Sequence, residues 1–222
     1  MKYSILFAIA GTYFLITGYN LANIWGYLLI WMAISYYLVS LAYGGIGVKI
    51  FGKQSTGKIS LWAIALLLPY LSLIWLIWQI KRLLIKPAYH QITPNIWLGR
   101  LVNPDELPAQ IDLIIDLTCE FPEPSNFISN KEYICHPTLD ADAPTPDILQ
   151  DLAKTMGDRP DRNIYVHCAL GHGRSATVVA AYLLTTKQVT SVEEAIAFLK
   201  NIRPRVNLNA TQKAKLAGVL AT

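Results

Sequence analysis

Three long apolar stretches at the start of the chain place the strongest constraint on its fold. They run from Ser4 to Tyr19, from Ile24 to Tyr43 and from Ile59 to Ile80. A helix needs about 20 apolar residues to cross a bilayer core, a length that the last two stretches reach and the first nearly reaches. Apolar sequence resumes directly after the first stretch, so we interpret it as a retained segment and not as a cleaved signal peptide. The sequence predicts an all-α transmembrane region over residues 1–86.

The two parts of the chain differ in charge. Residues 1–90 carry 7 basic and no acidic side chains, and residues 91–222 carry 12 basic and 15 acidic ones, so their net charges are +7 and −3. The sum is the +4 of the whole chain, and the positive excess therefore belongs to the membrane region. We predict an integral membrane protein with a soluble domain and no binding to nucleic acid.

The basic residues of the first part leave two membrane arrangements open. They are Lys2, Lys49, Lys53, Lys58, Lys81, Arg82 and Lys86. Three full spans would put the first four on one face and the last three on the other. Two spans, followed by a third segment that re-enters or lies at the interface, would put all seven on one face. We favour the second arrangement because cytoplasmic loops are enriched in Lys and Arg, and because Pro69 permits a kink in the third segment.

After residue 86 the pattern changes to short β-like runs separated by helix signals. Strands are predicted over residues 95–99, 112–117, 132–136 and 163–167, and helices from Pro146, over 174–187, after Ser191 and over 210–220. This alternation predicts a layered α/β domain over residues 87–222, with a central sheet flanked by helices. The chain has 3 cysteines at irregular spacing, an odd number that excludes a disulfide framework.

The most informative stretch links a strand to a helix. The strand Ile164 to His167 is followed by Cys168, by a loop with two glycines and by Arg174 and Ser175 at the start of an apolar helix. Backbone N–H groups that converge at a helix N-terminus form a cradle for an anion. Reactive thiols favour such sites, so Cys168 is expected to be a thiolate at neutral pH, with Arg174 gripping two phosphate oxygens.

This stretch, HCALGHGRS, resembles the HCxxGxxRS loop of the cysteine-dependent protein tyrosine phosphatase superfamily, and specifically of its dual-specificity branch. The residues Ile92 to Gly99 look like the first strand of that domain, and Pro137 to Asp140 lie where the family places its general-acid loop. The resemblance covers residues 90–222. The chain is also similar to a bacterial group of membrane-attached dual-specificity phosphatases.

The resemblance implies a two-step mechanism. Cys168 would attack phosphorus and form a cysteinyl-phosphate, and Asp140 would act as general acid and then as general base. Arg174 would bind the equatorial oxygens, Ser175 would help the sulfur leave, and His167 would order the loop. The family uses no metal and no cofactor for this reaction, and the spacing of the Cys and His residues fits no zinc motif.

Several residues remain as phosphate-binding or rival candidates. The phosphate-binding residues implied by the resemblance are Ala169, Leu170, Gly171, His172, Gly173 and Arg174. Asp142 is the rival acid, although Asp140 is favoured because it follows Pro-Thr-Leu as the family's acid does. Glu120 and Gln212 are weaker candidates for lining the site or placing water.

The resemblance leaves the substrate open. A phosphorylated protein is the first expectation, and a phospholipid such as phosphatidylglycerophosphate or a phosphoinositide is the alternative. Lipid-selective relatives often carry a lysine after the cysteine, where this chain has Ala169, whereas a membrane anchor favours a lipid. A sulfurtransferase is a distant alternative, which needs no acid such as Asp140. We expect the soluble domain on the cytoplasmic side of a bacterial inner membrane, where its thiol is protected from oxidation.

Overall fold

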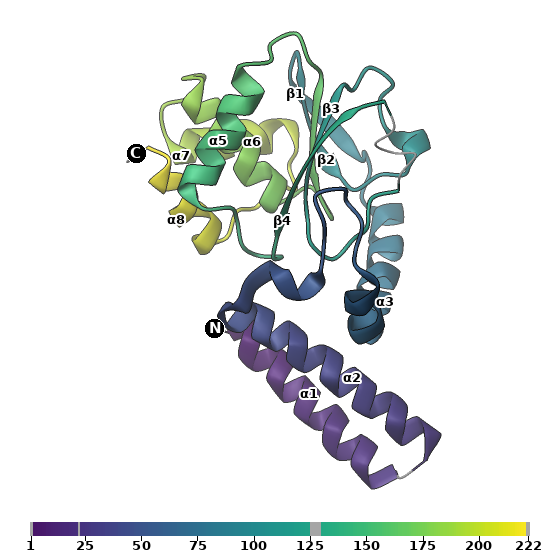
Figure 1. Ribbon diagram of the computed structural model, residues 1–222. Coiled ribbons are helices and arrows are strands. Elements are labelled where there is room, and N and C mark those ends of the chain that lie inside the picture. Colours follow the sequence, from purple (N-terminus) through teal and green to yellow (C-terminus); the bar gives the residue numbers. More distant parts are fainter. Residues whose placement is uncertain (1, 22, 125–129, 221–222) are drawn as a thin grey trace. The chain divides into compact units, whose positions relative to one another are not determined.

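The computed structural model describes residues 2–21, 23–124 and 130–220, and its contacts divide the chain into two units (Figure 1). The helical unit comprises the residues up to Ile80 together with Cys119–Pro122, and the second unit comprises Lys81–Thr118 and the residues from Glu123 onward. The contacts therefore group residues 81–86 with the second unit, whereas the boundary expected from the sequence lies after residue 86. That boundary stays a prediction.

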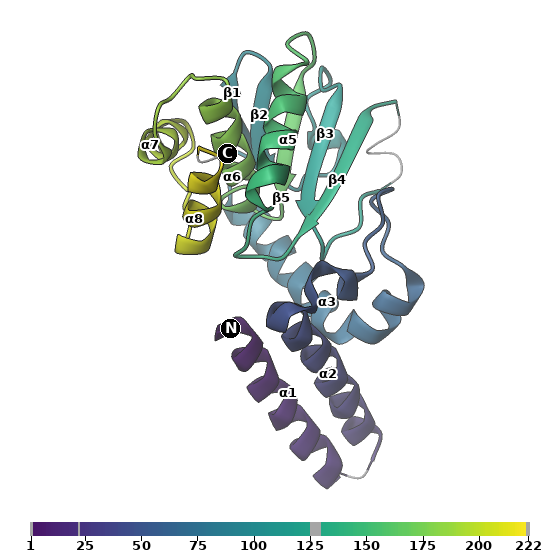
Figure 2. The ribbon, with the colours of Figure 1, turned by 60° about the vertical axis from the view of Figure 1, so that its left-hand side comes forward.

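The helical unit begins with two helices that run side by side (Figures 1 and 2). Helix α1 spans Lys2–Leu21 and helix α2 spans Ile24–Leu41. They approach closely where two glycines face each other, since a Cβ on Gly18 would lie 2.7 Å from the carbonyl oxygen of Gly26. Small residues allow such close packing between helices in a membrane. Helix α2 continues into a π-helical turn, Ala42–Ile46, and a 3₁₀ turn, Gly47–Phe51.

Helix α3, Leu61–Leu84, contains Pro69 and compensates for it through α2. Proline has no N–H to donate to the carbonyl four residues earlier, which is that of Ala65. The indole N–H of Trp31 donates to this carbonyl at 2.9 Å, and the N–H of Tyr70 donates to the hydroxyl of Ser35 at 3.3 Å. Helix α2 thus supplies the donor to the Ala65 carbonyl that Pro69 cannot provide.

Among the residues that the structure describes, three helices are long and apolar enough to cross a membrane: Lys2–Leu21, Ile24–Phe51 and Leu61–Leu84. The three apolar segments expected from the sequence are thereby confirmed as helices. The third extends four residues beyond the predicted end at Ile80 and forms one continuous helix through the proline. Whether it spans or re-enters the membrane stays a prediction.

The helical unit also contains a short segment from much later in the chain, Cys119–Pro122. Trp75 donates its indole N–H to the carbonyl of Glu120 at 2.9 Å, and Lys53 donates to the carbonyl of Phe121. The rings of Trp78 and Phe121 lie 5.5 Å apart. The two hydrogen bonds end on backbone carbonyls of the segment, so the side-chain pattern around Glu120 did not predict them.

The second unit is a five-stranded mixed sheet with the strand order β1-β2-β5-β3-β4. The strands are β1 Tyr89–Thr93, β2 Ile96–Arg100, β3 Leu113–Thr118, β4 Glu132–Thr138 and β5 Ile164–Cys168. The β1–β2 pair is antiparallel, while the pairs β2–β5, β5–β3 and β3–β4 are parallel. The layered α/β fold is confirmed, and the hairpin of β1 and β2 replaces the single strand predicted there.

Four helices cover one face of this sheet (Figures 1 and 2). They are α5 Pro146–Gly157, α6 Arg174–Thr185, α7 Val192–Ile202 and α8 Ala210–Gly218. Alternate residues of the strands, such as Ile115 and Val166, enter the large core beneath the helices, and Ile114 and Tyr165 enter a smaller core on the other face. Since β3, β4 and β5 are parallel, their carboxyl ends meet at one edge, where α6 begins.

Candidate active site

The loop between β5 and α6 turns its carbonyl groups outward. The N–H of Leu101 donates to the carbonyls of Cys168 at 2.7 Å and Ala169 at 3.3 Å. Arg203 donates to those of Leu170 at 3.2 Å and Gly171 at 2.9 Å. The N–H of Asn207 donates to the carbonyl of His172 at 2.9 Å. In a trans peptide the C=O and N–H point in opposite directions, so the loop N–H groups are left facing a common interior.

Glycine is required at one position of this loop. Gly171 has φ of +71°, a left-handed conformation that favours glycine. A Cβ at this residue would also overlap the backbone of Gly99 and lie 2.7 Å from the N atom of Arg100. The close approach of strand β2 to the loop therefore depends on this glycine, which fixes the curvature of the cradle.

The predicted nucleophile lies at the start of the loop and is buried. Cys168 is 4% exposed, and its Sγ atom is 3.3 Å from both the N–H of Gly171 and the hydroxyl of Ser175. Both groups donate toward the sulfur. The structure thus brings Ser175 to the sulfur, as the resemblance implies.

The predicted phosphate-binding arginine is held rigidly at the N-terminus of α6. Arg174 is 2% exposed and donates from Nη1 to the carbonyl of Thr138 at 2.9 Å and to that of Leu117 at 3.4 Å. These carbonyls lie in β4 and β3, so the sheet edge orients the guanidinium. Its other terminal nitrogen, Nη2, is 3.4 Å from Oδ1 of Asp140.

The two rival acids have different surroundings. The side chain of Asp140 is 77% exposed and lies against Arg174. Asp142 instead forms an ion pair with Lys215 at 2.6 Å, and its carbonyl accepts a hydrogen bond from Gln212 at 2.9 Å. Helix α8 thus binds the loop through Asp142 and leaves Asp140 at the tip. Gln212 therefore helps to hold the loop, and the choice of Asp140 as the acid stays a prediction.

Arg203 is a site residue that the sequence reasoning missed. Its guanidinium is bound to two loop carbonyls, to Nδ1 of His90 at 3.0 Å and to the carbonyl of Pro87 at 3.4 Å. It is 2% exposed, and a buried arginine with this many acceptors is a structural support. The sequence could have pointed to this residue only through the two basic side chains of Arg203-Pro204-Arg205, and such a pattern is equally typical of an exposed loop.

Cations surround the outer part of the loop. Burial, together with the positive charges of Arg203, Arg205 and Lys81, lowers the pKa of His172 to about 4. His172 is therefore neutral at pH 7, and the field at the loop is positive. This field favours the binding of an anion.

Arg100 links the loop to the end of α3 through Glu106. Its Nη2 atom is 2.7 Å from Oε1 of Glu106, and Nη2 of Arg82 is 3.2 Å from Oε2. Burial alone would raise the pKa of Glu106, but hydrogen bonds from Arg100 and the N–H of Asn103, with the charges of Arg100 and Arg82, hold it below its usual range. Glu106 is thus an anion that pairs with the buried Arg100.

We expect Glu106→Gln to destabilise the protein by about 1–3 kcal/mol at pH 7, because the buried Arg100 loses its counter-charge. A lowered folded-state pKa contributes stability that is present above the unfolded pKa of about 4.3 and is lost as pH falls through the folded pKa. We therefore expect denaturant unfolding in micelles to give a lower free energy of unfolding for Glu106→Gln than for the unaltered chain at pH 7. This difference should shrink below about pH 4. A difference of constant size would contradict the pairing.

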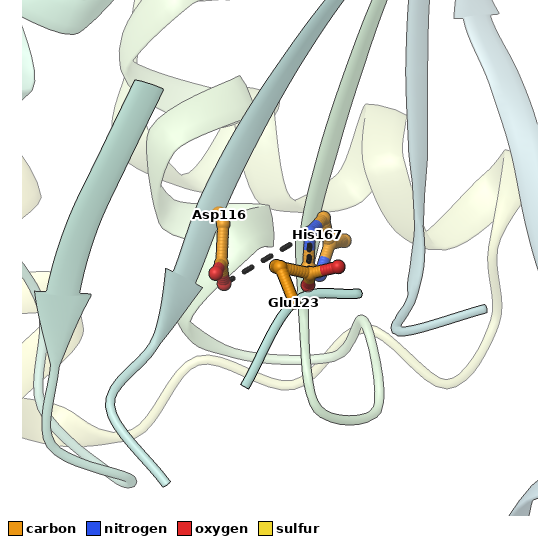
Figure 3. A group of neighbouring side chains, drawn as sticks. All are labelled: Asp116, Glu123 and His167. Carbon is orange, nitrogen blue, oxygen red and sulfur yellow. Dashed lines mark ion pairs between the residues drawn. The ribbon is translucent and has the colours of Figure 1, made fainter. Parts of the chain in front are cut away.

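His167 and Glu120 have surroundings that the sequence did not predict. His167 is fully buried in β5 and lies beside the carboxylates of Glu123 and Asp116 (Figure 3). Glu120 belongs to the helical unit, where its carboxylate accepts a hydrogen bond from the N–H of Cys119 at 2.9 Å. The argument from Cys and His spacing did not consider the group Asp116, Glu123 and His167, whose ligand atoms lie within 4.8 Å of one another.

Comparison with known proteins identifies the second unit. The family model described as "Dual specificity phosphatase, catalytic domain" matches residues 104–219. Phosphatidylglycerophosphate phosphatase PTPMT1 of Arabidopsis thaliana is 35% identical over 85 residues, which make up 38% of this chain and 23% of that protein. Dual specificity protein phosphatase 12 of Rattus norvegicus is 29% identical over 130 residues, 54% of this chain and 37% of that protein. The matches thus span well under half of these relatives.

Solved structures agree with the observed fold. The crystal structure of Tk-PTP in the active form has a TM-score of 0.56 at 23% identity, covering 61% of this chain and 97% of that one. The crystal structure of PTPMT1 has a TM-score of 0.51 at 25% identity, covering 60% of this chain and 96% of that one. The first of these likenesses concerns the fold alone.

Proposed function

The chain belongs to the dual specificity phosphatase family, and from this premise we propose that it is a membrane-attached, cysteine-dependent phosphomonoester hydrolase. The observation that carries the proposal is the loop of five outward-facing carbonyls, from Cys168 to His172, with a buried sulfur at one end and Arg174 at the other. Such a cradle holds a dianionic phosphate with its phosphorus in front of the sulfur.

In the proposed first step, the Cys168 thiolate forms a bond to phosphorus while the bond to the ester oxygen breaks. Asp140 gives its proton to that oxygen, which leaves as an alcohol. Arg174 and the loop N–H groups bind the three equatorial oxygens, where positioning and charge stabilisation supply most of the catalysis. The product of this step is a cysteinyl-phosphate.

In the second step, water attacks phosphorus and Asp140 accepts its proton. The bond between sulfur and phosphorus breaks, and the Ser175 hydroxyl, 3.3 Å from Sγ, donates a hydrogen bond to the returning thiolate. Inorganic phosphate leaves and the protonated Asp140 is restored. The chain's own residues account for every proton in this cycle.

We propose a phospholipid, with phosphatidylglycerophosphate first among them, as the substrate. Support comes from the Arabidopsis thaliana relative named phosphatidylglycerophosphate phosphatase PTPMT1, from the three membrane-length helices and from the cations around His172. A Rattus norvegicus relative is named phosphatidylglycerophosphatase and protein-tyrosine phosphatase 1, a name that covers both candidate substrates. This reverses the order expected from the sequence, which put a phosphorylated protein first. The phosphoprotein remains the second candidate, because Ala169 and Leu170 follow the cysteine where lipid-selective relatives often carry lysine.

We propose that the catalytic unit lies on the cytoplasmic side of the membrane. All seven basic residues of the first 90 lie on one face if α1 and α2 span the membrane and α3 does not. A cytoplasmic site also keeps the Cys168 thiolate in a reducing compartment.

We expect the purified full chain, in reducing buffer and mixed micelles, to release phosphate from phosphatidylglycerophosphate at least about tenfold faster than from phosphotyrosine peptides, as selective substrate positioning allows. Phosphoinositides serve as a second lipid, which tests whether any anionic headgroup suffices. Faster turnover of the peptides would overturn the lipid proposal and leave a tethered protein phosphatase. No turnover of any phosphomonoester would contradict the phosphatase function itself.

A further inference from the structure

The segment that carries Arg205 is bound to the phosphate loop on both sides of that residue. Two residues earlier, Arg203 donates to loop carbonyls at 2.9 and 3.2 Å, and two residues later the N–H of Asn207 donates to the carbonyl of His172 at 2.9 Å. Arg205 itself is exposed. Its backbone is therefore fixed beside the outer end of the loop, while its side chain is open to solvent.

A second exposed cation, Lys81, lies in the last turn of α3. The residue after it, Arg82, pairs with Glu106 at 3.2 Å, and Glu106 pairs with Arg100 at 2.7 Å. The residue after Arg100, Leu101, donates its N–H to two carbonyls of the loop. These contacts hold the end of α3 at the flank of the loop, and they lie wholly within the second unit.

Lys81 and Arg205 differ from the buried arginines of the site in their partners. Arg174 and Arg203 donate to backbone carbonyls. Among the residues that the structure describes, the side chains of Lys81 and Arg205 form no hydrogen bond and no ion pair. Both charges contribute to the lowered pKa of His172, and charges act strongly only over short distances. The outer end of the loop thus carries two positive charges that the described part of the fold does not pair.

The cradle itself has little positive charge. From Cys168 to Ser175, Arg174 is the one residue with a permanent positive charge, and the residues after the cysteine are Ala169 and Leu170. Arg174 and the loop N–H groups suffice for a single phosphate group. A second phosphate on the same substrate would lose water without gaining a partner unless a cation lay outside the cradle.

We propose that Lys81 and Arg205 form a second anion-binding site, which takes the phosphodiester of a lipid headgroup while the cradle holds its phosphomonoester. The inference rests on the proposed phosphatase function and identifies the part of the substrate that decides selectivity. In phosphatidylglycerophosphate a single glycerol joins the two phosphates, so both can be held at once. Arginine offers a fork for two oxygens, and lysine offers a compact charge.

The position of Lys81 suits a lipid phosphodiester. It lies in the last turn of a helix that is long and apolar enough to cross a membrane, and the nearby Leu83 and Leu84 are each 70% exposed. The phosphates of a bilayer lie where its apolar core ends, and a lysine at the end of such a helix extends toward them. The diester is attached to the acyl chains through one glycerol, so it is the phosphate that stays at this depth.

Two lipids with the same acyl chains separate the two phosphates. Phosphatidylglycerophosphate has the diester and the monoester, whereas phosphatidic acid has the monoester alone. We expect the full chain in neutral mixed micelles to prefer phosphatidylglycerophosphate in kcat/KM. The double variant Lys81→Gln with Arg205→Gln should lower this preference at least about tenfold, mainly through KM, because charged hydrogen bonds to the diester are lost.

A second double variant, Lys154→Gln with Arg162→Gln, removes the same charges from other exposed positions. Lys154 lies in the last turn of α5, and Arg162 precedes β5, whose other end bears Cys168. This control should keep the preference within about twofold, since exposed substitutions away from a site change little. An equal loss for both lipids in the Lys81→Gln and Arg205→Gln variant would overturn the proposal and leave two cations that attract any anionic surface.

Soluble headgroups test the second site without turnover. Full-length Cys168→Ser in micelles is titrated with deacylated phosphatidylglycerophosphate and with glycerol 3-phosphate. We expect the first to protect against thermal unfolding at concentrations at least about tenfold lower, and this advantage to disappear when Lys81 and Arg205 are also replaced. Equal protection by both ligands would overturn the proposal. If the advantage is found but no phosphomonoester is turned over, the second site stands and the phosphatase function fails.

Discussion

Replacing Cys168 with serine is expected to reduce phosphate release by roughly 10⁵- to 10⁶-fold, to the background rate, as loss of a covalent nucleophile does in other enzymes. A serine hydroxyl in this place is a far weaker nucleophile than a thiolate, and in the proposed first step Asp140 donates a proton, so it cannot also deprotonate the serine. Binding of phosphate should persist, because Arg174 and the loop N–H groups remain. The measurement is turnover of phosphatidylglycerophosphate in micelles, together with protection by phosphate in thermal unfolding.

Cys135→Ser is the matched control for this experiment. Cys135 lies in β4, is half-buried and has the same chemistry without the cradle. We expect the control to keep its activity within about threefold, since surface-proximal substitutions of similar size rarely cost more. Residual turnover above about 1% in Cys168→Ser, with the control fully active, would show that another group attacks phosphorus and would contradict the cysteinyl-phosphate mechanism.

The elements that were predicted correctly are those specified by local sequence. Strands β3 and β5 are mostly apolar and lie in the middle of the sheet, and α7 begins where Ser191 accepts a hydrogen bond from the N–H of Glu194 at 3.1 Å. The carboxylate of Glu194 also accepts a hydrogen bond from the N–H of Thr190 at 2.7 Å. At α5, which begins at Pro146, Thr145 makes no side-chain capping hydrogen bond. Capping geometry depends on rotamers that the sequence pattern does not specify.

The same distinction holds for the site. Cys168, Gly171, Arg174 and Ser175 lie within eight consecutive residues, so their proximity follows from a single strand, turn and helix. Arg203 and Glu123 reach the loop from segments more than 25 residues away, and a basic or acidic residue in a loop looks like an exposed one. The sequence therefore predicts the residues that would contact phosphate. It does not predict the distant residues that hold this loop in place.

The membrane region shows a third case, in which composition predicts an element but not its contacts. Apolar length alone predicted α1, α2 and α3, and the proline in α3 suggested a kink. The helix continues because Trp31 takes the place of the missing N–H at the Ala65 carbonyl. Since a bilayer provides no water for such a carbonyl, a partner in a neighbouring helix decides whether a proline interrupts the helix.

Asp140→Asn is expected to lower kcat/KM by about 10²- to 10³-fold for substrates with a poor leaving group, because an alkoxide must be protonated as it departs. The loss for p-nitrophenyl phosphate should stay within about tenfold, since nitrophenolate leaves without a proton. Measuring both substrates with one enzyme preparation separates the role of an acid from a general defect. Asparagine keeps the size of the side chain near Arg174 but cannot donate a carboxylic-acid proton.

Asp142→Asn is the control that the chain itself offers, two residues along the same loop. It removes the ion pair with Lys215, a partly exposed contact whose loss should cost less than about 1 kcal/mol. Any effect on kcat/KM should be small and equal for the two substrates, because Asp142 holds the loop and does not face the leaving group. If Asp142→Asn instead gives the selective loss and Asp140→Asn the equal one, the acid is Asp142. The loop must then change conformation during the reaction, because Lys215 binds the Asp142 carboxylate in the structure.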